Sequence, residues 1–548
     1  MLHFLRKRRV QRFFSRGEWM RRLFFLGYAE DTQEGDGLIL IQIDGLARGQ
    51  LERALKRRKM PFLRRLLRRH KYRLHSHYSG LPSSTPAVQG ELFYGRRCAV
   101  PAWDFYRNDT GAYRSMFDQA AAQEVETMLR EQGEGLLEGG SAYCDIYSGG
   151  AKTPNFCAAC LGWNYMLRIN PVGIALGLVL HAYVAVRLVA RLLLELVLAV
   201  RDLFAGVKPG EFWTEVRFIP GRTFMSIVMR DLTALGVKMD AARGVRVIHV
   251  NFLGYDDLAH RRGPGSLYAH WTLKGIDYCI SRIYRMAVIS SRRRYRIWIY
   301  SDHGQEKVVP YLRYAGKPIA EAVADVLRKQ GVNLERLRAA EQRRHTERGR
   351  WLRHDGEAAR KRAAQAEEET QDAKKEPKIT NKGPVSHVYL FAELPAALQE
   401  RVARALVLEA RIPMVLVRAG DAAVLHTAAG LFQLPEDTAK VFGNEHPFVQ
   451  AIGQDLVRLA HHRHAGNFVL LGWQQKGPYV SFAFENGSHA GPGPRETHGF
   501  ALLPEDSHLP ELEKGYLRPE DLFHAAQRVL GRAEAATPPA PAPATADR

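Results

Sequence analysis

Three short apolar runs constrain the fold of this chain most. Residues 37–43, 245–252 and 295–300 are rich in branched aliphatic and aromatic side chains, and each run is followed by a polar turn. Helical patterns lie at residues 50–69 and 272–292. Strands that alternate with helices predict an α/β fold with a central, mostly parallel sheet. In such sheets functional side chains gather where the strands end.

Segments of contrasting composition divide the rest of the chain. Regular structure resumes from Val385, where a strand pattern at residues 387–393, a helix from about residue 394 and further strands predict a small α+β subdomain. We predict a basic amphipathic arm at 1–36, a catalytic domain formed by 37–332 and 385–531, an apolar membrane-associating insert at 171–206, a charged flexible insert at 333–384 and a disordered Pro/Ala tail at 532–548.

The chain is strongly basic. It has 79 Lys and Arg against 58 Asp and Glu, a formal net charge of +21 in 548 residues. Its surface is therefore expected to attract nucleic acid, an anionic membrane or phosphorylated small molecules. Five cysteines are too few for a disulfide framework and indicate a reducing compartment, and we interpret Cys157 and Cys160 as ordinary thiols rather than a redox pair or half of a zinc site.

Chemistry-bearing residues stand at five strand ends or loops. Each alone has an ordinary structural interpretation, because Asp-Gly turns, solvated histidines and helix-capping hydroxyls are common. The five are Asp44 after the first run, Thr85 in a hydroxyl-bearing turn that opens a helix, Asp256 with His260 four residues later, Asp302-His303 after the third run, and His489 in a Gly-x-His-x-Gly turn.

In this order the five segments resemble the type I phosphodiesterase/nucleotide pyrophosphatase branch of the alkaline phosphatase superfamily. The spacings carry the resemblance: Thr85 lies three residues after Pro82 and ten before Gly95, His260 precedes Gly263-Pro264, and Ser301-Asp302-His303-Gly304 is intact. The resemblance implies an alkaline-phosphatase-like sandwich. It also implies that the chain is a metal-dependent phosphoric-ester hydrolase.

The resemblance further implies two divalent metal ions, usually zinc, with manganese also suited to a mixed Asp and His set. One ion would take Asp44, Asp302 and His303, and the other Asp256, His260 and His489. Thr85 would sit between the two ions as the nucleophile. Backbone N–H groups after Thr85 would help to hold the phosphoryl oxygens.

Several positions depart from the pattern or compete for a role. The branch has an asparagine shortly after its threonine, and Gln89 is the candidate substitute here. His498 competes with His489 as the last ligand, which we assign to His489 because of its glycine turn. Asp257 rivals Asp256, which the spacing to His260 favours, leaving Asp257 a supporting role. Sulfatase activity is not expected, because the arginine of the sulfatase motif is missing after Thr85.

Two segments predict contact with a membrane. The arm at 1–36 interleaves arginine with aromatic residues and has no export-signal core, so we expect no cleavable signal peptide. The arm suits an anionic bilayer, and a solvated basic arm or a helix packed on the domain explains its pattern equally well. The apolar stretch at 171–204 is broken by Arg187, Arg191 and Glu195. It cannot cross a membrane once, because the candidate catalytic residues lie on both of its sides. It is either an interfacial hairpin or helices buried in the protein or a partner.

The expected function is hydrolysis of a phosphodiester or pyrophosphate at the cytoplasmic face of an anionic membrane. A nucleotide, a phospholipid or a lipid-linked phosphate is the expected substrate. A transferase of the same superfamily is one alternative, and an inactive membrane-associated binding protein is another. We do not expect nucleic acid as a partner, since no zinc-finger or RNA-recognition pattern accompanies the basic residues.

Overall fold

The computed structural model describes residues 35–160, 224–290, 292–333, 377–509 and 514–532, together with Ala29 and eight residues between 186 and 197. The basic arm, the apolar insert, the charged insert and the Pro/Ala tail predicted from the sequence lie wholly or mainly outside these residues. Among the described residues, no helix has the length and apolar character needed to cross a membrane. The five cysteines are all free thiols.

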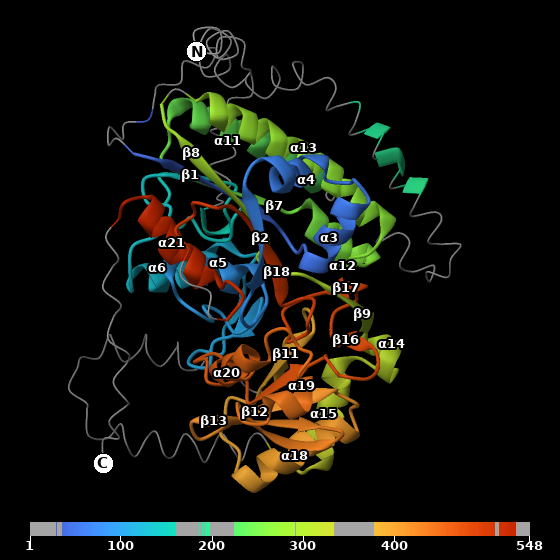
Figure 1. Ribbon diagram of the computed structural model, residues 1–548. Helices are drawn as coiled ribbons and strands as arrows, with labels where there is room; N and C mark the ends of the chain where they lie inside the picture. Colours follow the sequence, from blue (N-terminus) through green and yellow to red (C-terminus); the bar gives the residue numbers. More distant parts are fainter. Residues whose placement is uncertain are drawn as a thin grey trace, which may run out of the picture.

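A seven-stranded sheet forms the centre of the larger lobe (Figure 1). All of its strands run in one direction except β18, which is antiparallel to both of its neighbours. In spatial order the strands are β2 (Tyr72–Tyr78), β18 (His498–Pro504), β8 (Tyr295–Tyr300), β1 (Gly37–Ile43), β7 (Val247–Phe252), β5 (Ser141–Tyr143) and β6 (Thr153–Asn155). The predicted α/β fold with a central, mostly parallel sheet is confirmed.

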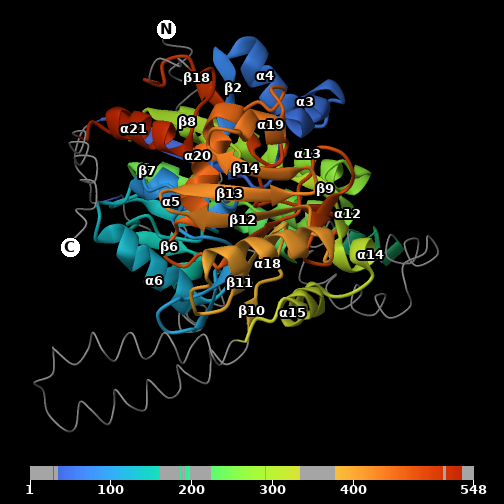
Figure 2. The same ribbon diagram turned by 90° about the horizontal axis from the view of Figure 1, so that it is seen from below.

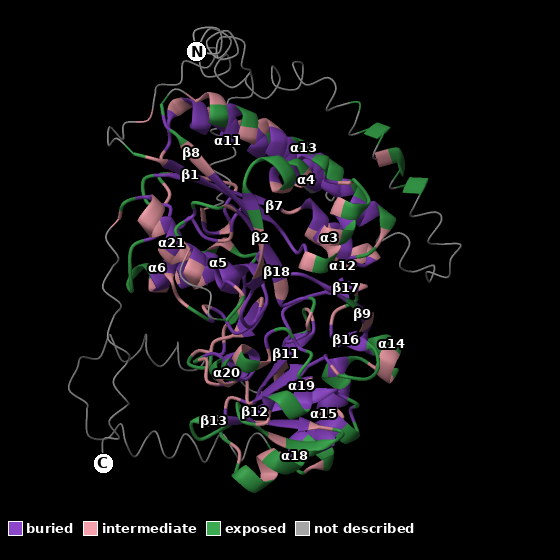
Figure 3. Cartoon of the chain, viewed as in Figure 1, coloured by how far each residue is buried: buried purple, intermediate pink, exposed green. Residues whose placement is uncertain are grey.

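Helices cover both faces of this sheet, because side chains of a strand point alternately to its two sides. In β1, Ile39 and Ile41 pack in one apolar core and Leu38 and Leu40 in the other. The first core contains α3 (Arg48–Lys56), α4 (Pro61–Arg69), α11 (Arg230–Arg243), α12 (Gly254–Arg262) and α13 (Leu267–Ile289), and the second contains α5 (Thr85–Tyr94), α6 (Gln119–Arg130) and α21 (Pro519–Val529). Figure 3 shows the buried sheet between these partly exposed helices.

The helix predicted at residues 50–69 is two helices, α3 and α4. Pro61 occupies the first turn of α4. A proline there has no N–H for an intrahelical bond with the preceding turn, so the chain breaks and a new helix begins. The carboxylate of Asp277 on α13 accepts the N–H of Phe62 at 2.9 Å and that of Leu63 at 3.0 Å, which fixes the start of α4.

The second lobe is built on an antiparallel six-stranded sheet (Figure 2), as the predicted α+β subdomain requires. Its order is β10 (Lys378–Ile379), β11 (Val385–Tyr389), β15 (Phe468–Leu471), β12 (Met414–Ala419), β13 (Ala422–Thr427) and β14 (Gly430–Leu434). Its helices are α15 (Ile319–Lys329), α18 (Ala396–Leu408), α19 (Thr438–Phe442) and α20 (Val449–Ala460). The domain boundaries drawn from the sequence stay a prediction.

Smaller elements complete the described chain. The chain that follows β8 forms the central strand of a small three-stranded sheet. Residues 487 and 488 pair with residues 307 and 306 in this sheet, so the Gly487 turn lies near the end of β8. The remaining elements are β9 (Glu306–Pro310), β16 (Tyr479–Ser481) and β17 (Gly487–Ser488) of that sheet, the hairpin β3 (Asp104–Tyr106) and β4 (Tyr113–Ser115), α14 (Tyr311–Ala315), the 3-10 turn at Ala158–Cys160 and the π-helix at Phe224–Met229.

A buried histidine joins the two lobes and makes their stability sensitive to acid. His387 on β11 accepts the Gly466 N–H at its Nδ1 and lies with Nε2 3.2 Å from the Pro101 carbonyl, a pattern that requires the neutral ring. Burial lowers the pKa of His387 to about 4. Because the folded pKa lies below the unfolded value near 6.5, the stabilisation is present above pH 6.5 and is lost as pH falls toward 4.

We therefore expect His387→Gln to flatten the fall of the unfolding free energy between pH 6.5 and 4 by up to about one proton equivalent. Urea unfolding at several pH values measures this slope. The partly exposed His524→Gln variant is the control, and an equal slope for both variants would contradict the assignment.

Candidate metal centre

The candidate ligands meet at the carboxyl edge of the central sheet. The strands β8, β1 and β7 are parallel neighbours, so their ends lie at one edge. Asp44 directly follows β1, and Asp302 with His303 follows β8 after one residue. The segment after β7, interpreted from the sequence as a strand end or loop, is helix α12, whose first and last turns carry Asp256 and His260. Their spacing of four places both on one helical face.

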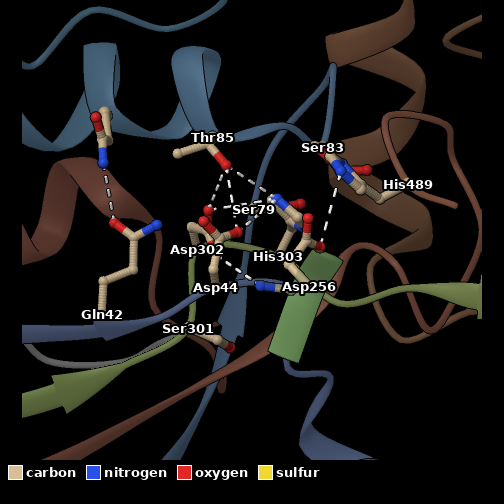
Figure 4. Close-up of polar contacts among 12 residues, drawn as sticks. Gln42, Asp44, Ser79, Ser83, Thr85, Asp256, Ser301, Asp302, His303 and His489 are labelled. Atoms are coloured by element: carbon tan, nitrogen blue, oxygen red, sulfur yellow. Dashed lines mark hydrogen bonds and ion pairs between the residues drawn. The ribbon is translucent and has the colours of Figure 1, made fainter. Parts of the chain in front are cut away.

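Thr85 lies among these side chains at the first position of α5 (Figure 4). Its Oγ1 donates to Asp302 Oδ2 at 2.9 Å and lies 3.4 Å from Asp44 Oδ1 and 3.3 Å from His303 Nε2. The side chain is only 4% exposed. The threonine hydroxyl is therefore held by one end of the helix against two carboxylates and an imidazole.

Two groups of side chains have a geometry that suits a metal ion. Asp44, Asp302 and His303 offer ligand atoms that all lie within 4.8 Å of one another, and so do Asp256, His303 and His489. The first group is the one expected from the sequence. In the second, His303 stands where His260 was expected, because its ring stacks on that of His489 with centroids 3.7 Å apart.

His260 remains beside the second group. Its Nε2 lies 3.2 Å from Asp256 Oδ2, while His489 Nε2 lies 4.0 Å from Asp256 Oδ1. The seven residues selected from the sequence are thus brought together. Asp257 and His498 are in neither group, and the His498 Nε2 lies 3.1 Å from the Ser76 hydroxyl. This arrangement favours His489 over His498 and Asp256 over Asp257.

The electrostatics of the centre call for a cation. Burial raises the pKa of Asp44 well above its usual value, and the charges of Asp302 and Asp256 raise it further. Burial likewise raises the pKa of Asp302. For Asp256 burial acts in the same direction, but the neighbouring His260 outweighs it and lowers the pKa. Three carboxylates and neighbouring imidazoles form a donor set that fits zinc or manganese.

Each imidazole is oriented by an oxygen at its Nδ1. His303 Nδ1 lies 3.0 Å from the Gly304 carbonyl, and His489 Nδ1 lies 2.8 Å from the Ser83 carbonyl. His260 Nδ1 lies 2.7 Å from Glu485 Oε2. An Nδ1–H held in this way leaves Nε2 with its lone pair free to bind a metal.

Sequence reasoning missed two of the supporting residues. Asn251 donates from Nδ2 to Asp44 Oδ2 at 2.7 Å, and a buried polar residue near the end of an apolar strand was a signal that could have found it. Glu485 has no such signal, because it is one acidic residue in a turn 225 positions from His260.

Gln89 does not replace the missing asparagine of the family pattern. Its Nε2 donates to Gln42 Oε1 at 3.2 Å and to Asp145 Oδ1 at 3.0 Å, and its Oε1 accepts the Ile146 N–H. These bonds tie α5 to the sheet and engage both ends of the amide with residues other than Thr85. Pro86 has no N–H, so the free backbone donors of this turn are those of Thr85 and Ala87.

Comparison with known proteins decides the family. The family described as Type I phosphodiesterase / nucleotide pyrophosphatase matches residues 38–430, most of the chain. The chain belongs to this family. It is accordingly a phosphoester hydrolase of a metal-dependent family, and the two side-chain groups at the sheet edge are its candidate metal ligands.

Solved structures resemble the phosphodiesterase chain only distantly. Phosphonoacetate hydrolase from Sinorhizobium meliloti 1021, in complex with phosphonoformate, is 14% identical, with 90% of this chain and 96% of that chain covered and a TM-score of 0.43. Murine ectonucleotide pyrophosphatase / phosphodiesterase 5, an inactive variant in complex with AMP, is 12% identical, with coverage of 91% and 96% and a TM-score of 0.42. The human counterpart is 11% identical, with coverage of 90% and 95% and a TM-score of 0.43. No curated protein matches the sequence.

Proposed function

We propose that this protein is a phosphodiesterase or nucleotide pyrophosphatase in which Thr85 is the nucleophile and two divalent metal ions, zinc or manganese, act at the sheet edge. The observation that carries the proposal is the position of the Thr85 hydroxyl, 2.9 Å from Asp302 Oδ2 and 3.3 Å from His303 Nε2 at a helix N-terminus. A structural threonine at this place would not need a cluster of candidate metal ligands around its hydroxyl.

We assign one ion to Asp44, Asp302 and His303 and the other to Asp256, His260 and His489. Because the two groups in the structure share His303, a movement of its ring toward Asp44 and Asp302 is part of this assignment. Divalent ions bound there would lower the pKa of the Thr85 hydroxyl and neutralise phosphoryl oxygens.

Groups of the protein itself attack the phosphorus atom and bind the phosphoryl oxygens. The Thr85 hydroxyl, which faces Asp302 Oδ2, releases its proton to water, and Oγ1 forms a bond to phosphorus as the bond to the leaving oxygen breaks. The leaving oxygen takes a proton from water and departs with the first product. The N–H groups of Thr85 and Ala87 bind the equatorial oxygens. A second water then attacks phosphorus, the bond to Thr85 Oγ1 breaks, and Oγ1 takes up the proton that this water loses. Phosphate or a phosphomonoester is released.

An amphiphilic substrate is the class we favour, such as a phospholipid or a lipid-linked phosphate, with a nucleotide as the soluble counterpart. The preference for an amphiphilic substrate is supported by the apolar stretch at 171–204, which lies in the sequence between Thr85 and Asp256. We propose that the enzyme works at the cytoplasmic face of a membrane, in keeping with its five free thiols.

The function is tested with bis-p-nitrophenyl phosphate and p-nitrophenyl phosphate. We expect the purified full-length protein to cleave the diester, to lose this activity after chelation and to regain it with zinc or manganese. Cleavage that survives chelation, or no cleavage of either ester with either metal, would overturn the proposal.

Glu485→Gln should weaken metal binding by about 10- to 100-fold. The Gln oxygen can still accept from Ser481 and Ser488, as Glu485 Oε1 does, but the amide N–H₂ then faces His260 Nδ1. The His260 ring would then keep only the Gly487 carbonyl, 3.0 Å from Nδ1, as an acceptor, and would lose the carboxylate that strengthens Nε2 as a metal ligand. Zinc affinity is measured by competition with a chromophoric chelator.

Glu306→Gln is the matched control for this experiment. Glu306 is a buried carboxylate that accepts the Arg495 N–H at 2.9 Å, and its side chain makes no hydrogen bond or ion pair with a candidate ligand among the described residues. The zinc affinity of the Glu306→Gln variant should stay within about twofold of the wild-type value. An equal loss of zinc affinity in both variants would contradict the role of Glu485.

A further inference from the structure

Helix α13 has an unusual outward stripe. Its exposed side chains recur at helical spacing and are apolar, aromatic or cationic: Leu267, Trp271, Lys274, Tyr278, Arg285 and Val288. Leu267 is 75% exposed, and Trp271, Tyr278 and Val288 are between 40% and 46% exposed. Large apolar side chains aligned on one exposed helical face mark an interaction surface more often than isolated ones do.

The basic helices α3 and α4 border this stripe along the length of α13. His270 Nε2 lies 2.8 Å from Gln50 on α3, Asp277 caps α4, and the ring of Tyr284 lies 5.3 Å from that of Phe62. Positions 271, 278 and 285 follow these contacts by one residue, about 100° round the helix. The helices α3 and α4 thus lie beside α13 (Figure 1), and the exposed stripe borders their basic side chains. We call this combined surface the α3–α4–α13 face.

The charge of this face is of one sign. Eight Lys and Arg side chains between residues 53 and 71 are exposed. The only acidic residue between 48 and 73 is Glu52, and it pairs with Arg48 at 3.1 Å. A partner must therefore supply negative charge beside an apolar layer that accepts aromatic rings.

We propose that the α3–α4–α13 face docks on an anionic lipid bilayer. Anionic headgroups would bind the arginines of α3 and α4, and Trp271 and Tyr278 would lie at the interfacial level that such rings prefer. Nucleic acid matches the charge but offers no apolar layer for Leu267 and Val288. This inference does not depend on the proposed catalytic mechanism.

Docking here would hold the metal centre close to the headgroups. Leu267 follows the candidate ligand His260 by seven residues, and α3 begins four residues after Asp44. Two short segments, from Asp44 to α3 and from His260 to α13, thus connect the metal centre with this face. A phosphate ester in the bilayer surface would lie near the catalytic edge of the sheet.

The test compares binding of the full-length protein to vesicles of phosphatidylcholine alone and of equal parts phosphatidylcholine and phosphatidylglycerol. We expect salt-sensitive binding to the anionic vesicles only. The triple variant Arg65→Glu, Arg68→Glu, Arg69→Glu should bind them at least about tenfold more weakly. Trp271→Ser with Tyr278→Ser, which leaves the charge unchanged, should also weaken binding.

The control carries the same charge change on the other lobe, Arg401→Glu, Arg404→Glu and Arg418→Glu, at exposed positions of α18 and β12. It should bind like the wild type, and cleavage of a soluble ester by all variants verifies folding separately from docking. Equal losses of vesicle binding in the face and control variants, or binding of the wild type to RNA but not to the anionic vesicles, would overturn the proposal.

Discussion

Thr85→Ala should lower kcat for diester cleavage by at least about 10³-fold. The variant removes the oxygen that forms the bond to phosphorus and leaves the rest of the centre in place. The pocket around it is already packed, since all ten residues of α5 are buried, so the loss of one hydroxyl and one methyl should not displace the helix. Single-turnover rates with bis-p-nitrophenyl phosphate measure the loss.

Two neighbouring variants make this result specific. Thr85→Ser keeps a hydroxyl at the same atom and should retain measurable activity. Ser84→Ala removes a buried hydroxyl that has no hydrogen-bond partner among the described residues, so its kcat should stay within a few-fold of the wild-type value. If Thr85→Ala keeps wild-type activity, Thr85 is not the nucleophile.

Asp302→Asn should abolish metal-dependent activity, again by at least about 10³-fold, and should also remove the stabilisation that metal gives to the fold. The same substitution should leave the metal-free protein at least as stable as the wild type. Asp302 and Asp44 are buried carboxylates that both contact the Thr85 hydroxyl, so neutralising one relieves the repulsion. Thermal unfolding with and without zinc separates the two effects.

Asp256→Asn and Asp257→Asn provide the matched comparison. The two residues are adjacent on α12, but only Asp256 belongs to a metal-suited group. Asp256→Asn should behave like Asp302→Asn, and Asp257→Asn should keep both activity and the thermal response to zinc. The reverse order of effects would reassign the ligand on this helix.

Local pattern was sufficient for much of the fold and for the members of the site. The strand β1 begins and ends at the predicted residues, and α5 begins at Thr85, because apolar runs, turns and capping positions act within a few residues. The long helix at 50–69 was wrong because the helical pattern continues through Pro61, where the backbone cannot. The proposed ligands were found because each stands directly after a strand or in a short motif.

Contacts between residues far apart in the chain could not be predicted from the local sequence pattern. Glu485 meets His260 from 225 positions away, and the amide of Gln89 is taken by Gln42 and Asp145. Contacts of this kind depend on how three separate elements pack, and one sequence contains no signal for that packing.

The sequence by itself determined the family pattern, the parallel sheet and the seven candidate residues at its edge, since these follow from the order of strands and the residues that end them. Only the tertiary structure decided how they are shared: His303 lies within reach of both Asp44 and Asp256, and His489 rather than His498 joins them. It also decided that α3 and α4 lie along the exposed stripe of α13. The physical reason is that burial and side-chain direction are set by packing between segments far apart in the chain, while the choice of strand or turn is set mainly by neighbours.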